Sequence, residues 1–485
     1  MRLRKSYALV IAAVCWALHS QCASADDIGP LPPQAAAQLV ESKFIFPQQH
    51  KENVHSSSII QLPDGGLLAA WFQGSGECDV DDVRIMGARK PAGTAKWSEP
   101  FLLADTPGHP DCNPVLWIDK SNRLWLIWSA ILSNDWKSSL IKYRVSTEYM
   151  NASGAPKWDW QDVLHLKPID LDRHMLSGWN HLLESVLFVP RALAAELSTA
   201  STSQLLVDVT KLALAVALLI SISLAVNAWR RRRTGHSGWK RFVLRASATY
   251  ATLLAATAAG AIGFFSWQSS DKLNQRLGWM TAEKPIQLST GEIVIPLYSD
   301  RFIASIMAIS TDGGATWEAS DPLVGYGNIQ PSLVERRNGD LVAWMREAGL
   351  RKRVRFSVSS DRGHTWSPVR ESELPNPGAK VAVTALENGD WVLAHNPLVD
   401  GRHELALAIS KDEGATWQPF HALDQVLPEA GSCSYPSLIQ TADGCIQVTY
   451  SYRQQDGKSI KHVTLRPPGQ APQIELAKVP DTIRR

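Results

Sequence analysis

The sequence predicts an all-β protein built as a six-bladed β-propeller. Two observations lead to this prediction: an eight-residue motif recurs at the spacing of one blade, and a strand–turn–strand pattern occurs six times. A four-stranded propeller blade typically takes about 40–50 residues. The composition agrees with a large folded domain, since 45% of the 485 residues are hydrophobic and 20% are charged.

The eight-residue motif has the form Ser-x-Asp-x-Gly-x-Thr-Trp. Its aspartates are 49 and 51 positions apart (361 − 312 and 412 − 361). Such a motif forms a tight turn between two strands, because the carboxylate accepts backbone N–H bonds, the glycine adopts a positive φ and the tryptophan packs on a neighbouring strand. We therefore assign these aspartates a structural role and expect degenerate copies near Trp97 and Trp158. The three copies contain Asp312, Asp361 and Asp412.

A second repeat counts the blades. Each copy begins with a strand, passes through a polar turn and returns as an apolar strand. The wide gap between the second and third copies is one blade junction that carries an insertion, so the propeller is expected in two parts, over residues 40–165 and 280–466. The copies are Ser57–Phe72, Pro114–Trp128, Pro285–Tyr298, Pro331–Met345, Val381–His395 and Pro436–Tyr450.

Residues 1–25 have the features of a secretory signal peptide. Arg2, Arg4 and Lys5 precede an apolar segment, and Ala23-Ser-Ala25 is a small-residue cleavage site. An uncleaved membrane anchor is the alternative. After cleavage four cysteines remain in a compartment that permits disulfides, but the sequence does not define their pairing. They are Cys78, Cys112, Cys433 and Cys445.

The insertion predicts a transmembrane hairpin after a helical connector over residues 166–203. The apolar segments 204–229 and 246–267 each approach the ~20 residues that cross a bilayer. The loop between them, 230–245, carries arginines and lysines and no acidic residue, which is typical of a cytoplasmic loop. A buried helical hairpin is the alternative. The lipid bilayer is thus an expected partner of residues 204–267, with the propeller on the periplasmic side of a bacterial inner membrane.

The charge distribution argues against a nucleic-acid partner. The formal net charge is +2, and ten positive charges lie in the N-terminal segment and the basic loop, which leaves −8 for the remainder (2 − 10). No cysteine or histidine spacing suggests a metal site, and no cofactor is expected.

In a propeller the inner strands begin around the central axis, so the residues at their starts converge on one pocket. Two arginines near these positions suit the carboxylate of an acidic sugar. Structural roles remain open for several of these residues: core packing for Tyr435, a buried imidazole for His55 and local loop bonds for Asn113. The candidates at strand starts are His55, Asn113, Gln330 and Tyr435, and those at strand ends or in loops are Arg346, Arg402 and the acidic group Glu77, Asp79, Asp81 and Asp82.

These segments resemble the sialidase superfamily, in which the eight-residue motif is known as the Asp-box or BNR repeat. The resemblance covers about Asn53–Ser129 and Pro285–His462. It implies a glycoside hydrolase with Tyr435 as nucleophile, Asp79 as general acid, and Arg346 and Arg402 binding the sugar carboxylate. The matching segments are Asn113–Leu116 with Leu124–Trp128, Gln330–Leu333 leading to Arg346, His395–Pro397 with Arg402, and Ser434–Leu438.

Two positions depart from that family. His55 stands where the family has its first arginine, and Gln330 stands where it has the glutamate that activates the tyrosine. An amide cannot accept the phenol proton, so catalysis would need a substitute base such as His55 or Glu77. The resemblance therefore implies an exo-glycosidase acting on sialic acid or a related acidic sugar. The alternatives are a non-catalytic glycan-binding propeller and a scaffold whose hairpin assembles with membrane partners.

Overall fold

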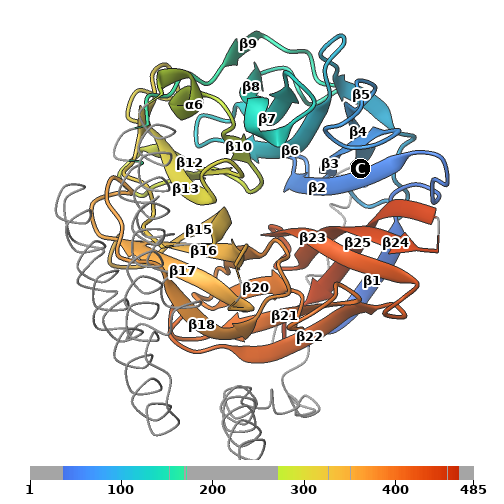
Figure 1. The fold of residues 1–485 in the computed structure, drawn as a ribbon. Coiled ribbons are helices and arrows are strands. Elements are labelled where there is room, and N and C mark those ends of the chain that lie inside the picture. The colour runs from blue at the N-terminus through green and yellow to red at the C-terminus, as the bar shows by residue number, and fades with distance from the viewer. Residues whose placement is uncertain are drawn as a thin grey trace, which may run out of the picture.

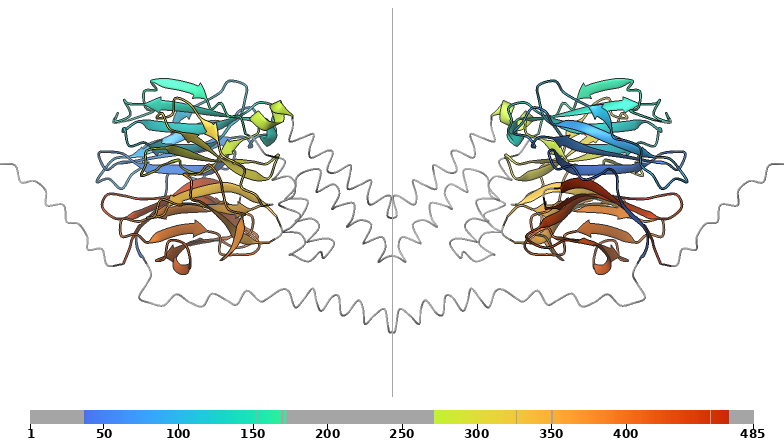
Figure 2. Two further views of the ribbon diagram at one scale, coloured as in Figure 1. Left: turned by 90° about the vertical axis from the view of Figure 1, so that its left-hand side faces the viewer. Right: turned by 90° about the vertical axis from the view of Figure 1, so that its right-hand side faces the viewer.

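The computed structural model describes residues 37–171 and 271–468, apart from 152, 169, 170, 326, 350 and 456. Within these ranges six antiparallel sheets surround a central axis (Figure 1). In the edge-on views of Figure 2 the blue to green-yellow blades and the orange to red blades form two halves of one ring. The prediction of an all-β, six-bladed propeller is confirmed.

The first three blades contain the strands between Asn53 and Ala319. In the third blade the innermost position is shared by two short strands, β10 and β11, which both pair with β12. The strands are β2 (Asn53–Gln61), β3 (Leu67–Gly74), β4 (Arg84–Lys90) and β5 (Phe101–Ala104); β6 (Asp111–Ile118), β7 (Leu124–Ile131), β8 (Ser139–Ser146) and β9 (Trp160–Val163); and β10 (Met280–Thr281), β11 (Ile286–Gln287), β12 (Ile293–Ser299), β13 (Ala304–Ser310) and β14 (Glu318–Ala319). Two short helices, η1 (Trp136–Ser138) and α6 (Lys272–Arg276), flank these blades.

The last three blades follow the same order, with one exception at the ring closure. The outer strand of the sixth blade is β1 (Gln38–Phe44), which pairs antiparallel with β25 from Gln38↔Arg466 to Phe44↔Lys461. The start of the described chain thus closes the ring, which the sequence repeats did not predict. The remaining strands are β15 (Asn328–Glu335), β16 (Leu341–Glu347), β17 (Arg353–Ser359) and β18 (Arg370–Pro375); β19 (Ala382–Ala385), β20 (Trp391–His395), β21 (Glu404–Ser410) and β22 (Gln418–Gln425); and β23 (Gly431–Gln440), β24 (Ile446–Gln454) and β25 (Gly457–Arg466).

Serine hydroxyls join neighbouring blades near the axis. Ser58 Oγ of β2 accepts a hydrogen bond from Leu116 N of β6 at 3.0 Å. Ser332 Oγ of β15 likewise accepts a hydrogen bond from Val383 N of β19 at 3.0 Å. Ser437 Oγ of β23 accepts one from Ile59 N of β2 at 3.3 Å. An inner strand is the edge of its own sheet, so its free N–H groups need partners from outside that sheet. These three hydroxyls supply them and set the register between blades.

The Asp-boxes form the turns that the sequence predicts. In the first copy Asp312 accepts hydrogen bonds from Thr316 Oγ1 at 2.6 Å, Thr316 N at 2.9 Å and Ser310 Oγ at 2.8 Å. The bonds from Thr316 are the main reason that the pKa of Asp312 lies far below its usual value. Asp361 and Asp412 repeat the bond to the threonine hydroxyl, each at 2.6 Å.

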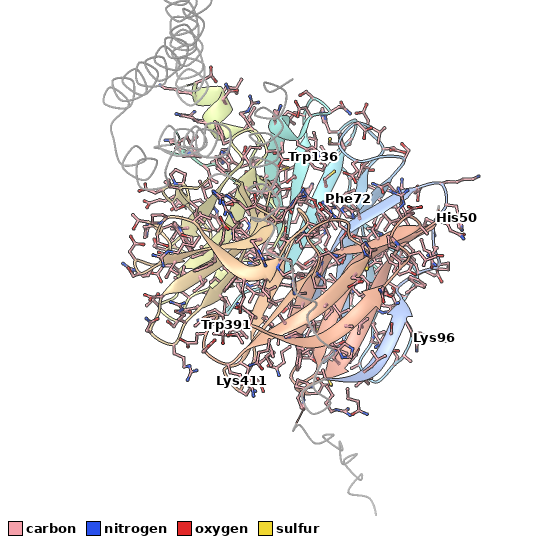
Figure 3. All side chains as sticks on the ribbon, turned by 60° about the horizontal axis from the view of Figure 1, so that its bottom comes forward. His50, Phe72, Lys96, Trp136, Trp391 and Lys411 are labelled. Atoms are coloured by element: carbon pink, nitrogen blue, oxygen red, sulfur yellow. The ribbon has the colours of Figure 1, made fainter. Side chains whose placement is uncertain are left out.

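Each complete box also packs on the preceding blade. Trp317 meets Trp125 of the second blade edge to face at 6.4 Å, and Trp417 meets Trp344 of the fourth blade at 5.1 Å. Figure 3 labels Lys411 of the third box near Trp391, whose ring lies against Gly414 of the same box. Trp97 and Trp158 lie in the corresponding third-to-fourth-strand connections of the first two blades and pack on hydrophobic clusters.

Several expectations fall outside the described residues. These are the signal peptide over 1–25, almost all of the connector over 166–203 and the hairpin over 204–267 with its basic loop 230–245. Where the structure describes the chain, no helix is both long and apolar enough to span a bilayer. The four cysteines Cys78, Cys112, Cys433 and Cys445 are free thiols.

The packing of the first box predicts a stability difference between two glycine substitutions. Gly314 and Gly339 both have positive φ, 93° and 88°, but a Cβ at Gly314 would lie 2.5 Å from the Trp125 ring while a Cβ at Gly339 would meet nothing within 4 Å. We expect Gly339→Ala to lower the free energy of unfolding by about 1 kcal/mol through backbone strain alone. Gly314→Ala should cost roughly 1–3 kcal/mol more through overpacking. Urea unfolding of both variants measures the difference, and equal losses would contradict the proposed contact.

Candidate functional site

Six equivalent residues surround the axis at one level. Every inner strand pair is joined by the same turn, whose first residue accepts a hydrogen bond from the glycine or asparagine three positions later. Counting back six residues from the first residue of each turn gives one axial position per blade (62 − 56, 119 − 113, 288 − 282, 336 − 330, 386 − 380 and 441 − 435). We call this set the axial ring: Ser56, Asn113, Ala282, Gln330, Lys380 and Tyr435.

Four members of the ring have a left-handed backbone. Their φ angles are 55° for Ser56, 52° for Asn113, 54° for Gln330 and 58° for Tyr435. In each of these blades the ladder between the first two strands shifts register at this point, as in a β-bulge. Non-glycine residues avoid this region, at a cost of order 1 kcal/mol, and such strain concentrates at functional sites.

The axial ring differs from the set of strand-start residues that the sequence predicts. The first-blade member is Ser56, and His55 precedes it by one residue. The members of the third and fifth blades, Ala282 and Lys380, were not among the predicted candidates. Because both blades lack the Asn/Gln/Tyr-Pro pattern that the second, fourth and sixth blades have at this position, only the distance from the turn identifies these two residues.

Tyr435 is the centre of a hydrogen-bonded cluster. Its Oη accepts hydrogen bonds from Arg346 Nη1 at 3.0 Å and from Gln330 Nε2 at 3.2 Å. Arg346 Nη1 also donates to Gln330 Oε1 at 3.3 Å, while its Nε is buried without an acceptor among the described residues. The guanidinium therefore keeps donor capacity that the surrounding protein does not satisfy.

Gln330 links Tyr435 to a second phenol that sequence analysis did not identify. Its Nε2 also donates to Tyr298 Oη at 3.3 Å, and Asn113 Nδ2 donates to the same oxygen at 3.2 Å. Tyr298 is the next-to-last residue of the apolar strand β12, so its sequence context indicates only core packing. Burial is the first cause that raises its pKa well above 10, and the charges of Asp300 and Tyr435 add to it. Tyr298 is thus a neutral hydroxyl, held in place by Asn113 and Gln330.

Arg402 and His55 pack on the ring of Tyr435. The Arg402 guanidinium lies 5.6 Å from the ring centroid, and the His55 ring lies 4.2 Å from it, tilted by 53°. Burial lowers the pKa of His55 to about 3, and the charges of Arg402, Lys380, Lys458 and Arg346 act in the same direction. His55 is therefore neutral at physiological pH and does not act as a third cation.

Three carboxyl groups lie on the same side of the propeller with different surroundings. Asp79 is exposed and accepts its hydrogen bond from Glu77 N in its own loop, at 3.0 Å. Glu77 accepts from Asn53 Nδ2 at 3.2 Å, and its charge acts on Arg402. Asp300 follows β12, and burial raises its pKa although Arg346 opposes the shift. Asp300 is a carboxyl group near Arg346 that the sequence pattern did not single out.

The other two acids of the loop have structural partners. Asp82 accepts hydrogen bonds from Ser75 N at 3.0 Å and Ser75 Oγ at 2.9 Å, which closes the loop. Asp81 accepts one from Asn134 Nδ2 of the second blade at 2.8 Å. Within the described parts of the chain no group of three or more His, Cys, Asp or Glu side chains could hold a metal ion.

Sequence and structure comparisons agree with the repeat pattern. The family model of the BNR repeat-like domain matches residues 65–179 and 236–448, which is more than half of the chain. The chain belongs to the BNR repeat-like family. A sialidase of Bacteroides fragilis is 25% identical over 193 residues, which cover 37% of this chain and 34% of that protein. The chain thus spans about a third of the length of this curated relative.

Solved structures show the same fold. A protein of unknown function from Dyadobacter fermentans superposes with a TM-score of 0.56 at 14% identity, over 89% of this chain and 99% of that one. The NanB sialidase from Streptococcus pneumoniae gives 0.55 at 11% identity, over 87% of this chain and 70% of that one. At this identity the likeness establishes the propeller fold and leaves the reaction to the site itself.

The environment of His55 predicts a pH dependence of stability. Its folded-state pKa of about 3 lies below the ordinary value of 6.5, so its stabilising contribution is complete above pH 6.5 and is lost as the pH falls towards 3. Below pH 6.5, protonation of His55 in the unfolded chain should lower the free energy of unfolding by up to about 1.4 kcal/mol per pH unit. Urea unfolding between pH 7 and pH 4.5 should show a smaller slope for His55→Gln than for the wild type. Equal slopes would contradict a neutral, desolvated imidazole.

Proposed function

We propose that the protein is a sialidase-like exo-glycosidase that removes terminal sialic acid or a related acidic sugar. The observation that carries this proposal is the cluster at Tyr435, where a phenol oxygen on the propeller axis accepts a hydrogen bond from Arg346 while Arg402 covers the ring. The BNR repeat-like family and the sialidases among its relatives support the same reaction class.

Arg346 and Arg402 would bind the sugar carboxylate. Arg346 has an unsatisfied Nε, and burial lowers the pKa of Arg402, which means that an incoming anion relieves the cost of a desolvated cation. Tyr435 would attack the anomeric carbon, and Asp79 would protonate the leaving oxygen. A phenol suits this role because a carboxylate nucleophile would repel the carboxylate of the sugar.

The phenol proton needs an acceptor other than Gln330. His55 is a weak base, with a pKa of about 3. Asp300 is the group that we assign to this step, since burial raises its pKa and it lies within the electrostatic reach of both Arg346 and Tyr298. Glu77, whose charge acts on Arg402, is the alternative acceptor.

A non-catalytic glycan-binding propeller is the second candidate. Gln330 is fully engaged with two phenols and Arg346, and His55 is neutral, so the site has hydrogen-bond donors and cations without a carboxylate bonded to Tyr435. Such a site would hold an acidic sugar without activating the phenol.

A panel of aryl glycosides of acidic sugars separates the two candidates. The wild type should release the aryl group from at least one of them, and Tyr435→Phe should lower kcat by roughly 10³-fold or more, because it removes the nucleophile and leaves the ring contacts of His55 and Arg402 in place. Arg402→Ala should raise KM more than it lowers kcat. Saturable binding of the sugar by the wild type without any product would instead establish the binding module.

Gln330→Glu provides a further arm of the same assay. A carboxylate at this position would lie beside Tyr435 Oη, where it can accept the phenol proton. For an enzyme we expect kcat to rise, and Gln330→Leu is the matched control that removes the amide without adding a base. A loss of activity in both variants would show that the amide itself is required and that Asp300 or Glu77 acts in its presence.

We also propose that the propeller is exported through the signal peptide over 1–25 and anchored in the membrane by residues 204–267. The support is the sequence pattern together with the position of the insertion, which leaves the propeller after β9 and returns before β10, so that it interrupts no blade. The full chain should sediment with membranes, and deletion of 204–267 should release a folded propeller to the soluble periplasmic fraction. A full chain that is soluble after fractionation would contradict the anchor.

A further inference from the structure

Two lysines cross the propeller axis, one in the axial ring itself and one two residues after the ring member Ala282. Lys380, the ring member of the fifth blade, donates to Ala282 O of the third blade at 2.8 Å and pairs with Glu283 at 2.6 Å. Lys284 of the third blade donates to Ser437 Oγ and, at 3.5 Å, to Leu438 O of β23. The third and sixth blades are opposite in the ring, so the Lys284 side chain spans the channel.

These lysines separate two spaces on the axis. On one side is the Tyr435 cluster, where the charge of Lys380 contributes to the low pKa of His55. On the other side is a cavity of about 450 Å³ whose walls reach the turns that follow the inner strands. Along β23 the five steps from Tyr435 to Gln440 (440 − 435) correspond to about 16 Å. The residues of its wall that matter here are Glu283, Lys284, Thr384, Glu387, Leu438 and Gln440.

The charges around the inner end of the cavity do not cancel. Glu283 and Lys380 form an ion pair in which both side chains are almost fully buried, at 6% and 1% exposure. Lys284 adds a second positive charge, and both of its hydrogen-bond acceptors are neutral groups. Among the described residues no carboxylate lies within ion-pair distance of its Nζ, which leaves a net charge of +1 for the three side chains at neutral pH.

The surroundings of Lys284 destabilise its charged form. Burial lowers the pKa of its ammonium group to about 8, Lys380 acts in the same direction and Glu283 opposes it. The side chain is nevertheless partly exposed, because it lies in the wall of the cavity. An unpaired cation that protein surrounds and a ligand can reach is stabilised by an anion that enters the cavity.

The walls of the cavity carry little charge besides this cation and its neighbouring ion pair. Several peptide N–H groups of the wall are already hydrogen-bonded within the protein, as Val383 N is to Ser332 Oγ and Glu387 N is to Gln440 Oε1. Glu387 is the acidic side chain at the outer turns, and it is exposed, so that water screens its charge. The cavity thus offers one ammonium group at its inner end and little opposing charge.

We propose that this cavity is a second ligand site, separate from the Tyr435 cluster, which binds a compact oxyanion such as a phosphate or carboxylate group through Lys284. The volume of the cavity is sufficient for a small metabolite. The site does not depend on glycosidase activity, and its occupant would change the charge next to Lys380 and thereby the field at His55.

Affinity labelling with pyridoxal 5′-phosphate tests the site on the full chain. Its aldehyde reports which neutral amine it can reach: the amine attacks the aldehyde carbon, water leaves and a C=N bond forms. Borohydride then delivers hydride to this carbon and the nitrogen takes up a proton, which gives a stable secondary amine. Peptide mass spectrometry should find Lys284 labelled at low reagent concentration, since its lowered pKa makes the free amine more abundant than on surface lysines.

Inorganic phosphate and pyruvate serve as competing anions, one for each oxyanion class. Either should protect Lys284 from labelling, and calorimetry should show binding that Lys284→Gln weakens roughly tenfold or more, as expected for the loss of a charged hydrogen bond. Lys284→Arg retains the charge and should retain anion binding while losing the label. Arg402→Ala is the matched control, because it perturbs the Tyr435 cluster and should leave protection at Lys284 unchanged.

The possible results are distinct. Labelling spread over surface lysines without protection by either anion would overturn the proposal, as would unchanged anion binding in a folded Lys284→Gln variant. If Lys284→Gln does not fold, two other results decide. Protection of Lys284 by either anion in the wild type, together with anion binding by Lys284→Arg, would support the proposal, and the absence of both would contradict it. Loss of protection in Arg402→Ala would place the anion at the Tyr435 cluster and contradict a second site.

Discussion

The left-handed residue at the start of the inner strand is the constraint on which the site depends. In four blades this residue has a φ between 52° and 58°, and the ladder to the second strand shifts there. A bulge re-aims the side chain that precedes the regular strand. It brings Asn113, Gln330 and Tyr435 to one level around the axis, while the serine two residues later, where present, binds the next blade. The same local geometry therefore positions the cluster and joins the sheets that carry it.

Positively charged side chains predominate near the axis. They come from the third to the fifth blade and are Lys284, Arg346, Lys380 and Arg402. Among these four, Lys380 alone has a short ion pair in the channel. Desolvation lowers the pKa of Arg402, Lys284 and His55 alike, so that the protein resists further protonation at the axis. This accounts for a neutral histidine beside two guanidinium groups. An axis of this kind favours anions at both of its ends, one at the Tyr435 cluster and one in the cavity behind Lys284.

Local patterns made the fold predictable, and long-range geometry limited the prediction of the site. The Asp-box carries its own hydrogen bonds within seven residues of sequence, and the inner turns repeat in every blade, so both could be recognised without the structure. The closure of the ring by β1 could not, because that strand is largely exposed and lacks the apolar alternation of the others. Tyr298, Asp300 and Lys380 were missed because their neighbours in sequence indicate only a strand end or a blade start. They join the site through contacts between blades, which no single repeat contains.

The two departures from the sialidase pattern belong together electrostatically. Relative to that pattern, His55 removes a positive charge and Gln330 removes a negative one, so the net charge of the cluster is unchanged. The structure shows why one change favours the other. With a glutamate at position 330, the carboxylate would balance a cation at position 55. With glutamine at 330, an arginine at 55 would be a third guanidinium beside Arg346 and Arg402 and would have no counter-charge. Even the imidazole of His55 stays neutral at this place. The Gln330 amide donates hydrogen bonds to two phenol oxygens. An ionised glutamate has no hydrogen to donate to them. The two residues therefore form a self-consistent alternative to the sialidase pattern, held by hydrogen bonds, and a base for Tyr435 would have to be one of the carboxyl groups around it.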